Sequence, residues 1–101
     1  DAGAIVASVE ALIRRPLDLI IGKPSQIMIQ VLLQKLDLPA EACLITGDRL
    51  ETDIEMGSLA GMGTALVLTG VTSRLQAEEA SSHPDFVLET LNDFVSAVLN
   101  L

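Results

Sequence analysis

Apolar residues along this chain follow two alternating spacings, which predict helices separated by short strands. Residues at three- and four-residue intervals predict helices over about 2–14, 25–36, 52–60, 75–80 and 90–99. Short apolar runs predict strands at 18–21, 43–46, 64–68 and 86–88. Because helices and strands alternate without a long linker or repeat, the pattern predicts βα units and a parallel sheet, which is an α/β fold.

Polar residues and glycines mark several of the predicted helix ends. Ser25 is placed to cap the second helix, and Gly61 and Gly63 are placed to stop the helix that precedes the strand at 64–68. Thr90 and Asp93 resemble a capping box at the start of the last helix. That helix carries a single apolar stripe, which we expect to cover one face of the sheet.

Two aspartates follow the second predicted strand. Asp48 comes just past the apolar run that begins at Cys43, and Asp53 falls in the first turn of the next helix. Ligands of open α/β sheets bind at this carboxyl edge, and Mg²⁺ favours a few carboxylates with retained waters and phosphate oxygens. The residues alone also fit a second interpretation, in which Gly47-Asp48 is an ordinary turn and Asp53 interacts with the helix dipole.

Two further segments are expected at the same edge. Lys23 follows the first predicted strand in the sequence Gly-Lys-Pro-Ser, where a cation could neutralise a phosphoryl group or simply be solvated. The loop at 69–73 follows the strand at 64–68 and is either a polar turn or a rim beside a ligand. His83 has no second histidine or nearby cysteine at metal spacing, so neither zinc binding nor catalysis is expected of it.

Composition limits the classes of partner. The formal charge of −8 argues against a nucleic-acid surface and makes a bare phosphate ligand improbable without a cation. Only two of the residues are aromatic although 50% are hydrophobic, so the core must be aliphatic. Cys43 is the one cysteine and is expected to be a small buried hydrophobe. The sequence shows no secretory signal, transmembrane run or lipidation motif, so we expect no membrane contact and a cytoplasmic location.

The order of these segments resembles the C-terminal half of haloacid dehalogenase (HAD) superfamily phosphatases, specifically the NagD-like and 4-nitrophenylphosphatase branch (subfamily IIA). The matching segments span most of the chain and are 3–7, 22–25, 47–54, 60–65, 68–72 and 84–87. The resemblance implies a Rossmann-like parallel sheet with flanking helices. It also implies that residues 1–16 are the last helix of the cap region and residues 17–101 the C-terminal half of the catalytic core.

The resemblance assigns roles to the candidate residues. Lys23 would be catalytic and would contact the phosphoryl group, while Asp48 and Asp53 would hold Mg²⁺. Thr69 and Gly70 would lie beside the substrate, which would be a small phosphorylated metabolite. The implied activity is Mg²⁺-dependent hydrolysis of a phosphomonoester through an aspartyl-phosphate.

The family's Asp-x-Asp-Gly-Thr-like nucleophile motif does not occur in these 101 residues, and neither does its Ser/Thr phosphate motif. We therefore expect the chain alone to be inactive, with either a missing N-terminal half or a homo-oligomer completing it. The alternative is a non-catalytic truncated α/β module that binds a partner or self-associates through an uncovered strand edge. A response-regulator domain fits poorly, because there the phosphoacceptor aspartate precedes the lysine, whereas Lys23 precedes Asp48.

Overall fold

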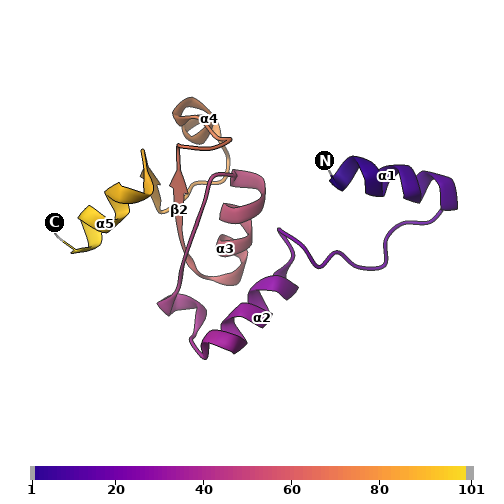
Figure 1. The fold of residues 1–101 in the computed structure, drawn as a ribbon, viewed down its shortest axis with the longest axis horizontal. Coiled ribbons are helices and arrows are strands. Elements are labelled where there is room, and N and C mark those ends of the chain that lie inside the picture. The colour runs from indigo at the N-terminus through magenta and orange to yellow at the C-terminus, as the bar shows by residue number, and fades with distance from the viewer. Residues whose placement is uncertain (1, 100–101) are drawn as a thin grey trace.

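The structure is a computed structural model that describes residues 2–99, with side chains as far as Ser96 in the last helix (Figure 1). The helical elements are α1 (Ala2–Ile13), α2 (Gln26–Leu36), the 3₁₀ turn η1 (Ala40–Ala42), the π-helical turn η2 (Leu50–Ile54), α3 (Glu55–Ala60), α4 (Arg74–Glu79) and α5 (Leu91–Leu99). The strands are β1 (Leu44–Gly47), β2 (Gly63–Val67) and β3 (Phe86–Leu88).

The three strands form one parallel sheet in the order β1-β2-β3. Leu44 pairs with Gly63 between the first two strands, and Ala65 pairs with Phe86 between the last two. The central strand is buried, since Ala65 and Leu66 are both 0% exposed. A short parallel sheet with connecting helices confirms the predicted α/β, Rossmann-like class.

The turn η2 and helix α3 pack directly on the sheet. A Cβ at Gly57 would lie 2.2 Å from Cγ2 of Ile45, so this glycine allows α3 to approach β1 closely. Ile54 is fully buried beside Leu66, and Leu50 and Ala77 complete the same aliphatic cluster. The core is therefore built from small and branched aliphatic residues, as the low aromatic content predicts.

The predicted helix boundaries largely match the observed ones. The Ser25 side chain accepts a hydrogen bond from the Ile27 amide at 3.3 Å and caps α2. Gly61 ends α3 with φ of 78°, a left-handed conformation that glycine adopts without a steric penalty. A capping box that the sequence analysis did not identify joins Ser73 and Gln76 at the start of α4.

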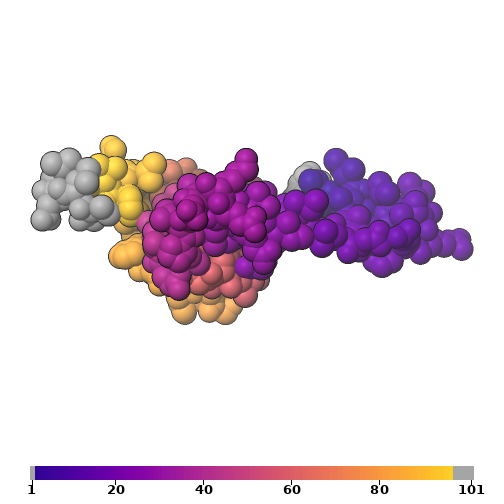
Figure 2. Space-filling model, turned by 90° about the horizontal axis from the view of Figure 1, so that it is seen from below, coloured from indigo at the N-terminus to yellow at the C-terminus, as the bar shows by residue number. Residues whose placement is uncertain are grey.

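The N-terminal arm, residues 2–21, projects away from the rest of the molecule (Figures 1 and 2). None of the residues of α1 is buried. The prediction of a strand at 18–21 is wrong, because the structure shows no strand there. Leu19 is 62% exposed and Ile20 is 59% exposed. A strand needs a hydrogen-bonding neighbour, and none of the three described strands lies beside this segment.

Two expectations about burial also need correction. The described part of the α5 stripe does not cover a face of the sheet: α5 contacts β3, yet Leu91 is 56% and Val95 41% exposed. The side chains of Val98 and Leu99, which belong to the predicted stripe, lie outside the described residues. β3 is only three residues long and lies at the edge of the sheet, so it offers α5 little surface. Cys43 is half-buried with a free thiol rather than fully buried.

An exposed ion pair joins α4 to the end of β3, where Arg74 donates a hydrogen bond to Glu89. This hydrogen bond and the charge of Glu89 raise the pKa of Arg74 above its usual value.

No helix within residues 2–99 is both long enough and apolar enough to cross a bilayer.

Three hydrogen bonds between Thr64 and Asp85 connect β2 to the start of β3, and they lead to a first prediction. Oδ2 of Asp85 accepts from the amide and hydroxyl of Thr64, at 2.8 and 3.1 Å, and Thr64 Oγ1 accepts from the Asp85 amide at 3.0 Å. Thr64 is only 1% exposed, so Asp85→Ala leaves a buried amide without its partner. We expect a loss of about 1–3 kcal/mol in the free energy of unfolding, measured by urea denaturation.

The matched control is Glu79→Ala in α4, whose side chain forms no hydrogen bond with the described residues, and it should change the free energy of unfolding by less than about 0.5 kcal/mol. Asp85→Asn keeps one acceptor oxygen and should fall between the two. Equal stability of Asp85→Ala and Glu79→Ala would show that this pair does not hold β3 in place.

Candidate functional site

Asp48 connects the loops that follow β1 and β2. It comes directly after Gly47, the last residue of β1, and its Oδ2 accepts a hydrogen bond from the Val71 amide at 2.8 Å. Its backbone carbonyl accepts a second one from the Thr72 amide at 3.1 Å. The two strands are parallel, so their carboxyl ends meet at one edge of the sheet, and Asp48 fixes the relative position of both loops there.

Asp53 lies one turn further along, in the π-helical turn η2, and is 7% exposed. A Cβ at Gly47 would lie 2.3 Å from Cβ of Asp53, so only a glycine allows this side chain to lie against the end of β1. Asp53 therefore lies against the residue that directly precedes Asp48 in the chain. The sequence analysis gave Gly47 no such role, although a glycine at the end of a buried strand was the available signal.

Lys23 forms an ion pair with the buried carboxylate. Its Nζ donates to Oδ1 of Asp53 at 2.7 Å, and the lysine side chain remains 47% exposed while that of Asp53 is 9% exposed. Gln26 donates to the Met56 carbonyl at 3.4 Å, which holds the start of α2 beside α3 and places the preceding lysine over η2. An ammonium group has three N–H donors, so two N–H groups of Lys23 remain for a ligand.

The loop after β2 contains the two remaining candidates, Thr69 and Gly70. A Cβ at Gly70 would lie 2.1 Å from Oδ2 of Asp48, so the glycine backbone lies directly against that carboxylate. Thr69 is exposed, and among residues 2–99 it forms no hydrogen bond with the other candidates. The structure thus brings Lys23 to Asp53 and Gly70 to Asp48, and leaves Thr69 at the rim.

The donor set fits a hard divalent cation that keeps part of its water shell. Among the described residues, Oδ1 of Asp48 and Oδ2 of Asp53 accept no hydrogen bond, so each carboxylate keeps one oxygen for a metal. No cluster of three or more acidic, histidine or cysteine side chains occurs in residues 2–99. Two carboxylates suit Mg²⁺, which is usually bound by one or two of them together with waters and phosphate oxygens.

One buried polar atom next to Asp53 in the chain has no hydrogen-bond partner among the described residues. Oγ1 of Thr52 is buried and makes no hydrogen bond within the described part of the chain. Thr52 lies between Glu51 and Asp53 in η2, and the sequence analysis gave it no role. A π-helical turn is itself often found at functional sites, because it re-aims side chains within a helix.

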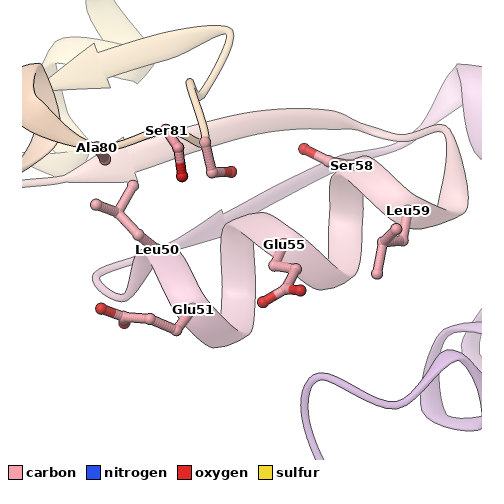
Figure 3. Close-up of a pocket in the computed structure, with 8 residues that line it drawn as sticks. Leu50, Glu51, Glu55, Ser58, Leu59, Ala80 and Ser81 are labelled. Atoms are coloured by element: carbon pink, nitrogen blue, oxygen red, sulfur yellow. The ribbon is translucent and has the colours of Figure 1, made fainter.

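The described cavities do not contain the candidate residues. A cavity of about 430 Å³ lies between η2, α3 and the loop after α4, and Glu51, Glu55 and Ser81 line it (Figure 3). Neither Lys23, Asp48 nor Asp53 lines this cavity. The candidate residues therefore lie outside this cavity, at the carboxyl edge of the sheet.

Known proteins are similar to this chain in both sequence and fold. The HAD-hydrolase-like family matches residues 20–94. The sugar-phosphatase AraL of Bacillus subtilis (strain 168) is 39% identical over 93 residues, which cover 92% of this chain and 34% of AraL. The chain therefore spans about a third of the length of this relative.

Solved structures give the same result. The 4-nitrophenylphosphatase from Thermotoga maritima is 43% identical with a TM-score of 0.91, over 97% of this chain and 38% of that one. NagD from Escherichia coli K-12 is 35% identical with a TM-score of 0.80, over 88% and 35%. A glycerol phosphate phosphatase from Mycobacterium tuberculosis, solved in complex with magnesium, is 32% identical with a TM-score of 0.78, over 89% and 27%.

The family match covers well over half of the chain, and the solved neighbours share its sheet and flanking helices. The chain therefore belongs to the HAD-hydrolase-like family, and its neighbours are phosphatases of the NagD and 4-nitrophenylphosphatase type.

Proposed function

We propose that this chain supplies the magnesium and phosphate ligands of a phosphomonoester hydrolase. The observation that carries the proposal is the Lys23–Asp53 ion pair at 2.7 Å, formed beside Asp48 at the carboxyl edge of the sheet. A lysine and two carboxylates at one edge can bind a phosphoryl group and a divalent cation together. The names of the relatives, which are sugar and glycerol phosphate phosphatases, support a small phosphorylated metabolite as the substrate.

Each residue has a defined part in this proposal. Asp48 and Asp53 hold Mg²⁺ through the oxygens that accept no hydrogen bond, and the magnesium complex of a solved relative supports this metal. When bound, Mg²⁺ neutralises charge on the phosphoryl oxygens. Lys23 orients Asp53 through the ion pair and donates its remaining hydrogen bonds to the phosphoryl group. Thr69 and Gly70 form the rim beside the substrate.

The net charge of the chain explains why both cations are needed. At −8 the protein repels a phosphate dianion, and the two aspartates add to that repulsion at the site itself. Lys23 and Mg²⁺ reverse the sign of the local charge. Binding of phosphate should therefore depend strictly on the metal.

The remaining assignments follow from the family resemblance. We propose that residues 1–16 belong to the cap region and residues 17–101 to the catalytic core. The projection of α1 away from the rest of the molecule supports this division (Figure 1). The nucleophilic aspartate would come from outside these 101 residues, which contain no Asp-x-Asp-Gly-Thr-like motif. A cytoplasmic location stays a prediction.

A second candidate function is that of a non-catalytic module that binds a partner or self-associates. The exposure of large apolar side chains favours it, because residues such as Leu12, Ile21 and Leu36 are 82%, 61% and 59% exposed. Apolar surface of this extent commonly marks an interaction site. This candidate does not exclude the first, since a binding face and a metal site can occur in the same chain.

The absence of the nucleophile motif predicts that the 101-residue chain is inactive by itself. In the presence of Mg²⁺, the rate of aryl phosphate hydrolysis with the chain added should equal the rate in buffer without the chain. Turnover that disappears in Asp48→Ala would contradict this prediction, because another carboxylate would then have to replace the nucleophile.

Magnesium binding tests the metal site without requiring activity. We expect Mg²⁺ to raise the midpoint of thermal unfolding, since a ligand that binds only the folded state stabilises it. Asp48→Asn and Asp53→Asn should each weaken Mg²⁺ binding by about tenfold or more, measured by isothermal titration calorimetry. Glu79→Gln, a charge-matched control in α4, should leave the affinity unchanged. If all three variants bind Mg²⁺ equally, the metal lies elsewhere.

The close approach of Gly70 to Asp48 gives a steric test of the same site. Gly70→Ala places a Cβ where Oδ2 of Asp48 now lies, so the carboxylate must move, and Mg²⁺ affinity should fall by about tenfold. Gly22→Ala is the matched control, because no heavy atom lies within 4 Å of its added Cβ. It should retain the affinity within about twofold. Equal affinities of the two variants would show that Asp48 need not occupy its present position.

A further inference from the structure

Each of the two carboxylates at the candidate site has one oxygen that already accepts a hydrogen bond. Oδ2 of Asp48 accepts from the Val71 amide at 2.8 Å, and Oδ1 of Asp53 accepts from Nζ of Lys23 at 2.7 Å. Both donors and both acceptors lie within the described residues, in the turns that follow β1 and β2 or precede α2. These hydrogen bonds therefore form without any further part of the protein.

The other oxygen of each carboxylate is free. Among residues 2–99, neither Oδ1 of Asp48 nor Oδ2 of Asp53 accepts a hydrogen bond. Neither atom is buried, because the buried side-chain polar atom without a partner in this part of the chain is Oγ1 of Thr52. Solvent therefore reaches both free oxygens, and each aspartate can offer one oxygen to a cation.

Packing also covers the hydrogen-bonded oxygen of Asp48. A Cβ at Gly70 would lie 2.1 Å from Oδ2, so the backbone of the loop after β2 lies against this oxygen. The Thr72 amide donates to the Asp48 carbonyl at 3.1 Å and holds the same loop in place. A cation that used both oxygens of Asp48 would have to compete with the Val71 N–H for Oδ2, at a position that the loop already occupies.

Charge has the same effect at Asp53. The Lys23 ammonium lies 2.7 Å from Oδ1, so a divalent cation bound to that oxygen would lie close to another positive charge. The Asp53 side chain is 9% exposed, and repulsion between charges is stronger where water is largely excluded. A cation bound to Oδ2 alone lies farther from the ammonium. Lys23 therefore directs a cation to one oxygen of Asp53.

The number of available oxygens affects the choice of cation. Mg²⁺ takes about six ligands, usually one or two carboxylates with retained waters, whereas Ca²⁺ takes about six to eight and often binds both oxygens of a carboxylate. We propose that the Val71 amide and Lys23 restrict Asp48 and Asp53 to one metal-binding oxygen each, and that this restriction makes the site prefer Mg²⁺ to Ca²⁺. The inference rests on the proposed metal site and names what selects its ion.

Isothermal titration calorimetry with Mg²⁺ and with Ca²⁺ tests the role of Lys23. The wild-type chain should bind Mg²⁺ more tightly than Ca²⁺. Lys23→Met frees Oδ1 of Asp53, and the ratio of the Ca²⁺ to the Mg²⁺ dissociation constant should fall by about tenfold. Loss of a positive charge strengthens binding of both divalent ions, so only a change in this ratio reports the freed oxygen. Lys35→Met, in the last turn of α2, is the control for charge and should keep the ratio within about twofold.

An ester in place of the Val71 amide tests the restriction at Asp48. The ester removes the N–H and changes no side chain, so it keeps the test valid should Lys23→Met fail to fold, which circular dichroism would show. The ratio of dissociation constants should again fall by about tenfold. An ester at Leu75 is the control, because the Leu75 amide lies in the first turn of α4 and donates no hydrogen bond within the described residues.

Infrared spectroscopy reports the same restriction without measuring affinity. The asymmetric and symmetric stretches of a carboxylate are farther apart when it binds a cation through one oxygen than when it binds through both. The difference spectrum between the Mg²⁺-bound and metal-free wild-type chains should show binding through one oxygen. The corresponding spectrum of Lys23→Met with Ca²⁺ should show binding through both.

Two results would overturn the inference and leave the metal site in place. One is a wild-type chain that binds Ca²⁺ as tightly as Mg²⁺, and the other is an equal ratio in the wild type, Lys23→Met and the Val71 ester. Failure of the proposed function gives a different result, because Asp48→Asn would then bind Mg²⁺ as tightly as the wild type. The inference would be lost together with the site in that case.

Discussion

The close packing of Asp53 against Gly47 is the constraint on which the candidate site depends. It brings the η2 turn against the end of β1, and a side chain at position 47 would overlap with the aspartate. Lys23 then binds the buried carboxylate from the segment before α2, at 2.7 Å. An uncompensated buried charge is costly, so Lys23 compensates the charge of Asp53, and the pair connects the segment before α2 to η2.

The same edge is organised from the other side by Asp48. Its carboxylate and its backbone carbonyl both accept hydrogen bonds from the loop after β2, and Gly70 lies directly against it. Two glycines thus allow two carboxylates to lie close to the backbone at neighbouring positions. This arrangement is compatible with the phosphate site that we propose, since Lys23 and a metal would neutralise the negative charge of the two aspartates there.

Much of this arrangement could be predicted from the sequence. The strand at Leu44 and the turn at Asp48 follow from a short apolar run that ends in Gly-Asp, and the Ser25 cap follows from hydroxyl chemistry at a helix start. The fold class was predictable because local alternation of helix and strand limits the sheet to parallel connections. The direct contact between Lys23 and Asp53 could not be predicted from local patterns, because thirty residues separate them. Only the tertiary packing of α2 on α3 brings them together.

The errors have a common physical cause. Leu17–Ile21 and α5 have the composition of a strand and of a sheet-covering helix, but composition does not provide the neighbour that each element needs. In the described part of the chain the first has no strand beside it, and the second lies against the short edge strand β3. The chain spans about a third of the length of the relative AraL, and about half of its exposed large hydrophobic residues lie in these segments and in α1.

Paramagnetic Mn²⁺, used in place of Mg²⁺ in an amide NMR titration, tests the central claim most directly, because it reports where the metal lies. Our account predicts selective broadening of the amide signals of Gly47, Asp48, Asp53 and Gly70, and loss of this broadening in Asp48→Asn. Broadening centred instead on Glu51 and Glu55, which line the cavity beside α3, would contradict the proposed metal site.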